Sequence, residues 1–130
     1  MIDEAPFISA HSSGSDWKLV AQDCVKQLRL VSSAHRLGII YVTDHFSSEF
    51  GKIAKFFKKN LGIDHWIGTV GFGVCAPNIE YFNEPAIVAM ILPVSNEAFR
   101  IFDGVTNDIT NITDRHKSWL EDILSPLTVC

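Results

Sequence analysis

Cysteine is scarce in this chain of 130 residues, which contains three of them at wide and irregular spacing. Cys24, Cys75 and Cys130 form no C-x-x-C pair and no Cys/His spacing of the kind that binds zinc. The five histidines share no metal-ligand spacing either. We therefore expect no metal site, and reduced thiols of the kind found in the cytoplasm.

Long hydrophobic runs are also missing. The longest, "PAIVAMILPV", is too short to cross a bilayer and is interrupted at Pro93. The N-terminal stretch "MIDEAPFISAHSSGSD" has two acidic residues near its start and no apolar segment of the kind found in a signal peptide. These absences predict a cytoplasmic protein with no membrane partner.

The chain has no excess of positive charge, since its net charge is −4 and its pI is about 5.6. An acidic chain gains little affinity from counterion release on DNA or RNA. The one lysine cluster, Lys52, Lys55, Lys58 and Lys59, fits the solvated face of a helix. We therefore expect no nucleic-acid partner.

What the sequence does have is apolar content, at 47% of residues, enough for one globular domain. Residues 1–14 are predicted to be a loose arm, and residues 15–130 a single domain. Apolar positions from Trp17 to Val31 recur at intervals of three and four, which predicts an amphipathic helix capped by Ser13 or Ser15.

Three segments rich in apolar and β-branched residues, 37–43, 65–76 and 86–93, predict strands. "LGIIYVT" (37–43) has no alternation and indicates a strand buried on both faces. A helix capped by Ser47 or Ser48 follows and ends at Gly62. Residues 65–76 and 86–93 have no room for a helix between them, which predicts antiparallel neighbours.

The fold class expected is therefore α/β or α+β. It would contain a mixed sheet with a β-α-β unit and a following antiparallel strand, with helices packed on the sheet. Near the C-terminus, Thr113 could cap a helix over residues 114–124. The last four residues, "LTVC", resemble the start of a strand, so we expect a truncated part of a longer protein.

The segment "GFGVCA" (71–76) matches the spacing G-x-G-x-x-A of a dinucleotide-binding turn. That turn needs a helix directly after it, and Pro77 with Pro85 leaves no room for one. We therefore expect no nucleotide cofactor and no other cofactor. Cys75 lacks an evident base, although His65 lies in the preceding strand, so a packing role is favoured over a nucleophile.

Several segments together resemble the FIST N-terminal domain family, a sensory module of F-box and intracellular signal transduction proteins. They are "SDWKLV", "LGIIYVT" and above all residues 68–93, with Gly71, Gly73, Glu80, Pro85-Ala86 and Pro93. The resemblance covers roughly residues 15 to 95. The glycine-pair segment and the C-terminal companion domain of the family are absent.

The resemblance implies a sensory domain that binds a small ligand such as an amino acid and catalyses no reaction. The backbone near Gly71 and Gly73 would approach the ligand, beside Cys75, and Thr43, Asp44 or Glu80 would fix a polar or amine group. Two alternatives stay open. One is a module that binds a signalling protein or a second copy without ligand, and the other is a cysteine-dependent enzyme.

Overall fold

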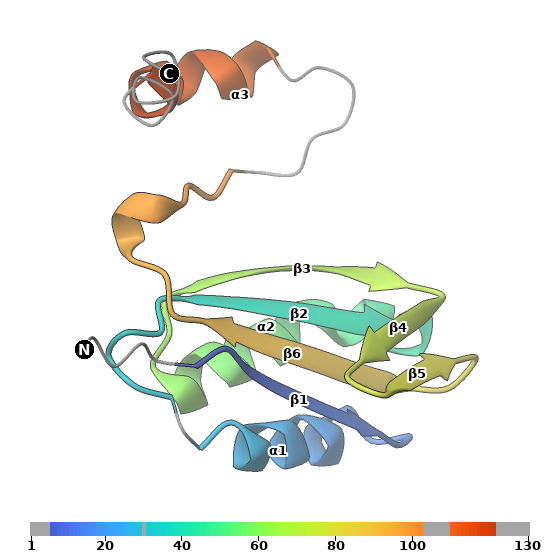
Figure 1. Cartoon of the computed structure of the whole chain (residues 1–130). Helices are drawn as coiled ribbons and strands as arrows, with labels where there is room; N and C mark the ends of the chain where they lie inside the picture. Colours follow the sequence, from blue (N-terminus) through green and yellow to red (C-terminus); the bar gives the residue numbers. More distant parts are fainter. Residues whose placement is uncertain (1–5, 30, 103–109, 122–130) are drawn as a thin grey trace. The chain divides into compact units, whose positions relative to one another are not determined.

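The computed structural model describes residues 6–29, 31–102 and 110–121 (Figure 1). The chain divides into two compact units, residues 1–100 and residues 101–130, where the sequence predicts one domain. The second unit contributes α3 (Thr110–Arg115) and a further helical stretch over residues 117–121. Because α3 begins before Thr113, that residue lies inside a helix and is not its cap.

The first unit is built on a four-stranded mixed sheet of order β1-β6-β2-β3. Its strands are β1 (Ile8–Ser13), β2 (Leu37–Thr43), β3 (His65–Gly71) and β6 (Ala86–Leu92). Strands β2 and β3 run parallel, joined by a helix, while β6 is antiparallel to both β1 and β2. This arrangement confirms the predicted fold class.

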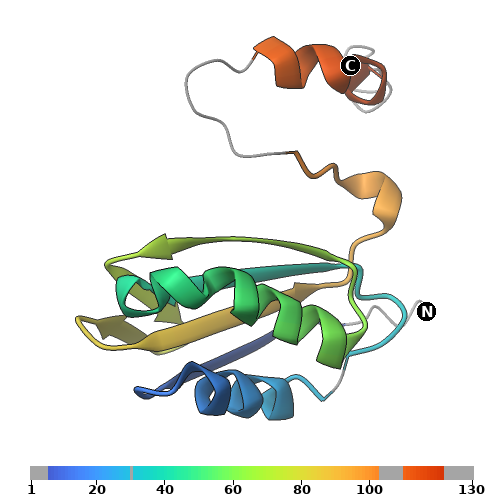
Figure 2. The same ribbon diagram turned by 180° about the vertical axis from the view of Figure 1, so that it is seen from behind.

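Two helices, α1 (Trp17–Gln27) and α2 (Phe50–Leu61), cover the same face of the sheet (Figure 2). A short 3₁₀ segment (Asp44–Glu49) leads from β2 into α2. Asp16 caps α1 by accepting from the Lys18 N–H at 2.9 Å, where the sequence favours a serine cap. Gly62 ends α2 in the left-handed conformation at φ 67°, as predicted.

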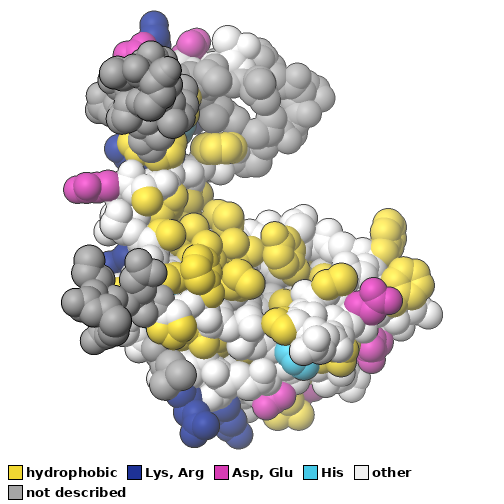
Figure 3. All heavy atoms as spheres, in the orientation of Figure 1, with side chains coloured by type: hydrophobic (Ala, Val, Ile, Leu, Met, Phe, Trp, Pro, Cys, Tyr) yellow, Lys and Arg dark blue, Asp and Glu magenta, His cyan; other side chains and the backbone are white. Residues whose placement is uncertain are grey.

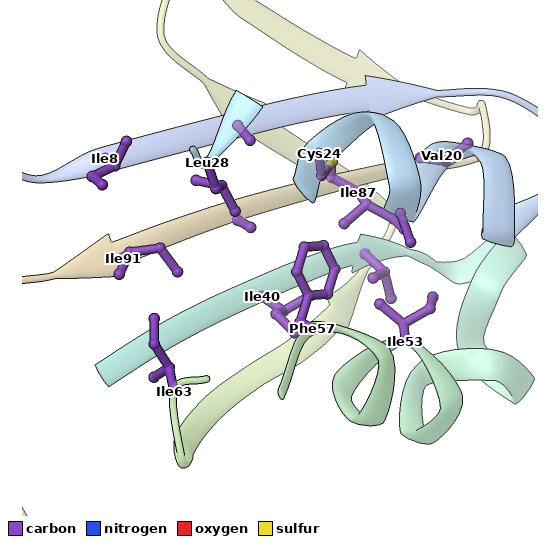
Figure 4. Packing of buried hydrophobic residues seen from close by; sticks show 14 of the residues in the cluster. Ile8, Val20, Cys24, Leu28, Ile40, Ile53, Phe57, Ile63, Ile87 and Ile91 are labelled. Atoms are coloured by element: carbon purple, nitrogen blue, oxygen red, sulfur yellow. The ribbon is translucent and has the colours of Figure 1, made fainter. Parts of the chain in front are cut away.

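The main core lies between these helices and the sheet (Figure 4). Ile53 and Phe57 of α2 and Cys24 and Leu28 of the α1 region are completely buried there. They pack on alternate residues of the strands, including Ile40, Ile87 and Ile91. Apolar residues spaced three and four apart on the helices thus pack against apolar residues spaced two apart on the strands, and together they form one core.

The opposite face of the sheet is only partly covered. A two-stranded hairpin of β4 (Gly73–Ala76) and β5 (Ile79–Phe82) packs on it through a second, smaller core of Val74, Tyr81, Ala86 and Val88. Elsewhere this face is open, so the prediction that β2 is buried on both faces is wrong: Tyr41 in its middle is 43% exposed.

Two other predictions need correction. The predicted loose arm contains β1, an edge strand whose serine-rich sequence "ISAHSS" gives little strand signal. The two strands predicted to be neighbours, β3 and β6, are separated by β2. The β4–β5 hairpin lies between β3 and β6 in the sequence. It carries the chain from one side of β2 to the other, where β6 pairs with β2.

Candidate functional site

The open face of the sheet carries an apolar surface. Figure 3 shows hydrophobic side chains gathered on the face that Figure 1 turns to the viewer. In register across the strands lie Ile39 of β2 and Met90 of β6, with Ile67 of β3 beside Ile39. All three are partly or largely exposed. The surface is therefore available to a molecule from solution.

Where the hairpin meets this surface there is a hollow of about 410 Å³, which we call the sheet hollow. Its floor is formed by the three strands β1, β2 and β6, and one wall by the end of β4 and the turn after it. The lining residues are Ser9, Ile39, Tyr41, Cys75, Ala76, Pro77, Val88, Ala89 and Met90. A hollow of this size lies within the range of small-molecule sites.

The rim of the sheet hollow has three groups capable of hydrogen bonding: the Ser9 hydroxyl, the Tyr41 hydroxyl and the Cys75 thiol. Within the described part of the chain, no hydrogen bond engages any of these three side chains. Among the residues that the structure describes, no charged side chain lines the hollow. The arrangement is an apolar floor with a few neutral polar groups, which suits an apolar molecule carrying one or two hydrogen-bonding groups.

The hairpin wall is held in place by two polar contacts. The Tyr81 hydroxyl of β5 is hydrogen-bonded to Nδ1 of His11 on β1, with the two rings 5.7 Å apart. Burial, and then the charge of Glu84, raise the pKa of Tyr81, so its hydroxyl stays protonated at neutral pH. At the start of β6, directly after the hairpin, the Thr43 Oγ1 accepts from the Ala86 N–H at 2.9 Å.

The structure brings some of the predicted site residues together at the carboxyl end of β2. Thr43 and Gly71 are register partners in β2 and β3, and Asp44 follows at the surface, 3.4 Å from the His45 ring. Thr43 is completely buried, and its hydroxyl oxygen already accepts a hydrogen bond from the Ala86 N–H. None of these three residues lines the sheet hollow.

The remaining predicted residues lie on the hairpin. Gly73 pairs with Phe82, and Cys75 pairs with Glu80 across β4 and β5. Gly71 and Gly73 flank Phe72, which is 79% exposed at the bend between β3 and β4. Of the six predicted residues, Cys75 is the one that lines the sheet hollow.

The segment "GFGVCA" contains the end of β3 at Gly71, a bend at Phe72 and the whole of β4, which begins at Gly73. Residues 65–76 therefore form two strands, where the sequence predicts one. His65 begins β3 and packs edge-on against Phe99 at 5.3 Å. No hydrogen bond joins it to Cys75 in the described residues. Those residues also contain no group of three or more His, Cys, Asp and Glu side chains able to hold a metal ion.

Sequence reasoning missed most of the sheet hollow. Ser9 lies in a segment predicted to be an arm, and Ile39, Tyr41 and Met90 lie in strands read as buried. Tyr41 could have indicated that one face of this strand is exposed, because a tyrosine within an aliphatic strand usually places its hydroxyl at a polar surface. None of the helices in the described residues is long and apolar enough to span a bilayer.

No protein-family model matches the chain, and no curated protein does. Among solved structures it is similar to CetZ from Methanosaeta thermophila, with 8% identity and a TM-score of 0.41 over 94% of this chain and 32% of CetZ. It is also similar to TubZ of Bacillus thuringiensis serovar israelensis in a GTPγS-form protofilament. The identity there is 17% and the TM-score 0.37, over 95% of this chain and 31% of TubZ. The chain thus spans about a third of these proteins, and at such TM-scores the likeness assigns no function.

Proposed function

We propose that this chain is a sensory domain whose small ligand binds in the sheet hollow. The observation that carries the proposal is an apolar depression of about 410 Å³ beside three neutral polar groups that have no partner among the described residues. A depression of this kind is the usual form of a small-molecule site. The resemblance to a sensory family points in the same direction.

The lining restricts the chemistry of the ligand. A charged group deep in the hollow would lose hydration without meeting an opposite charge, because the described lining contains no Lys, Arg, Asp or Glu. The ligand that fits is therefore a small apolar molecule. An apolar amino acid fits if its ammonium and carboxylate groups stay in water outside the hollow. Its side chain would lie on Ile39 and Met90, and its polar end would lie at the rim near Ser9 and Tyr41.

Thermal-shift screening of the full chain tests the proposal. At a free ligand concentration ten times Kd, binding to the native state stabilises it by about 1.4 kcal/mol, which raises Tm by several degrees. We expect leucine, phenylalanine and related apolar compounds to produce this shift, and lysine or glutamate to produce none. If no apolar compound in the panel gives a saturable shift, the proposal fails.

A pair of variants locates the site. Met90→Glu places a carboxylate in the hollow at a side chain that is 38% exposed, so the fold should tolerate it. Ile79→Glu is the matched control, because Ile79 is 40% exposed and lies outside the hollow. We expect Met90→Glu to abolish the ligand-induced shift and Ile79→Glu to preserve it. Equal shifts in both variants would place the ligand elsewhere.

A further inference from the structure

The two edges of the sheet differ in how their backbone is covered. At the β1 edge, the Gln27 side chain takes the place of a neighbouring strand. Its Nε2 donates to the His11 carbonyl at 2.8 Å and its Oε1 accepts from the His11 N–H at 3.1 Å. A side-chain amide that occupies both groups of an edge residue blocks further strand pairing there.

The β3 edge has no such protection in the described part of the chain. β3 pairs with β2 alone, and its sequence "HWIGTVG" contains no Lys, Arg, Asp, Glu or Pro. Five of its seven residues are exposed. Edge strands of soluble proteins usually carry charges, prolines or a covering segment, because unpaired backbone groups recruit another strand.

We propose that two copies of this chain pair through β3, antiparallel and centred on Gly68. In that register Gly68 lies opposite Gly68 of the second copy, Ile67 opposite its Thr69, and Trp66 opposite its Val70. Each pair joins an aromatic or aliphatic residue to a β-branched one, and no like charges meet. The edge is therefore complementary to itself, which a twofold interface requires.

The helix next to this edge leaves room for the second copy. The Trp17–Phe56 contact, at 6.3 Å, marks the side of α2 that faces α1. At 100° per residue, Ala54 and Leu61 lie on the other side of α2, and Gly51 lies between that side and the solvent-facing side. A side chain at Gly51 would meet nothing within 4 Å. Lys58 shares this side, but its flexible stem allows the ammonium to turn to water.

The difference between the edges also fixes the size of the assembly. Pairing through β3 uses the open edge of each copy and leaves outside only the β1 edges, where the Gln27 side chain occupies both backbone groups of His11. Association then stops at a dimer and does not continue into a fibre. The apolar surfaces of the two copies, including Ile67 of each, become one continuous face.

Sedimentation velocity of the full chain over a wide concentration range is the first test. We expect a reversible monomer–dimer equilibrium without larger species. A chain that stays monomeric throughout would overturn the proposal, and so would open-ended polymers. Hydrogen exchange tests the location of the interface without any substitution. If β3 pairs in the dimer, its backbone amides should exchange more slowly as the protein concentration rises.

Two charge variants test the register. Ile67→Lys/Thr69→Lys sets two pairs of opposed lysines across the interface, and Ile67→Glu/Thr69→Glu sets two pairs of opposed glutamates. Both side chains are exposed, so the monomer should keep its fold, as circular-dichroism melting can verify. We expect each variant alone to dimerise on the order of tenfold more weakly, and the equimolar mixture to recover a heterodimer.

A lysine at the other edge is the control. Ser13→Lys adds one positive charge at an exposed position on β1 and should leave the dimer unchanged. If Ser13→Lys weakens association as much as the β3 variants, or if the folded lysine and glutamate variants stay monomeric when mixed, the β3 register is wrong.

Discussion

Thr43 illustrates how a residue that looks like part of a binding site can be a structural one. It lies at the carboxyl end of a strand, where ligands of α/β proteins often bind. In the structure it is completely buried, and its Oγ1 accepts from the Ala86 N–H at 2.9 Å. That hydrogen bond fixes the start of β6 against the end of β2, so the hydroxyl serves the fold.

Replacing Thr43 should therefore affect stability. Thr43→Val keeps the shape but leaves the buried Ala86 N–H without its acceptor, which should lower the free energy of unfolding by about 1–3 kcal/mol. Thr43→Ser retains the hydroxyl and should lose less. Urea denaturation followed by circular dichroism measures both. Equal losses in the two variants would show that the hydrogen bond is not the stabilising element.

The two described cysteines lie in opposite environments. Cys75 is exposed at the sheet hollow, whereas Cys24 is completely buried with its thiol 3.8 Å from the Ile87 carbonyl oxygen. Burial, with a smaller effect of the Asp23 charge, raises the pKa of Cys24 to about 12. Folding therefore favours the neutral thiol, and alkylating reagents should reach Cys75 long before Cys24.

This pKa shift predicts a loss of stability in base. The ordinary pKa of the thiol is 9.0, so its contribution is complete below pH 9 and declines as the pH rises toward 12. The free energy of unfolding should therefore fall between pH of about 9 and about 12. It should fall less steeply in Cys24→Ala, with Tyr81 supplying part of the remaining slope. Identical slopes for the two proteins would contradict the assignment.

At the scale of elements, the pairing of β2 with β3 depends on two glycines. The Trp66 ring covers Gly38, where a Cβ would overlap it, and its Nε1 donates to the Ile63 carbonyl at 2.7 Å. At Gly68 a Cβ would overlap the backbone carbonyl of Ile40. A side-chain neighbour can move aside, but a paired backbone cannot do so without breaking the ladder.

Alanine at two glycines should therefore have opposite effects. Gly68→Ala should destabilise the chain by about 1–3 kcal/mol, because β3 must move away from β2. Gly51→Ala in α2 meets open space and should stabilise it by about 0.5–1 kcal/mol through helix propensity. Thermal unfolding of both variants checks the signs. A neutral Gly68→Ala would show that the close approach is not required.

Elements with strong local signals were predictable. The helix α2 combines apolar spacing with a glycine at its end, and β6 is an unbroken aliphatic run. β1 was missed because its polar residues alternate with few apolar ones, and its partner lies more than seventy residues away in sequence. The order of β6 in the sheet depends on such long-range pairing, which no local pattern specifies.

At the scale of the whole molecule, the sheet hollow arises from four segments separated in sequence: Ser9, Ile39 to Tyr41, Cys75 to Pro77, and Val88 to Met90. Nothing in the local sequence distinguishes these residues from other strand residues. The hollow forms because the hairpin covers only part of the sheet face. The order and spacing of the predicted strands and helices correctly gave the fold class, because these patterns are local properties of the sequence. The location of the hollow depends on how the strands assemble, which no local pattern specifies. The sequence therefore predicted a site mainly at the strand ends, and Cys75 is the one predicted residue that lines the hollow.

The most direct test of the ligand site uses the methionine methyl groups. The sequence contains two methionines, Met1 and Met90, and Met90 lines the sheet hollow. In protein labelled with ¹³C at the methionine methyls, titration with leucine or phenylalanine should shift the Met90 signal saturably and leave the Met1 signal in place. A Met90 signal that stays unmoved by every apolar compound that raises Tm would contradict the account.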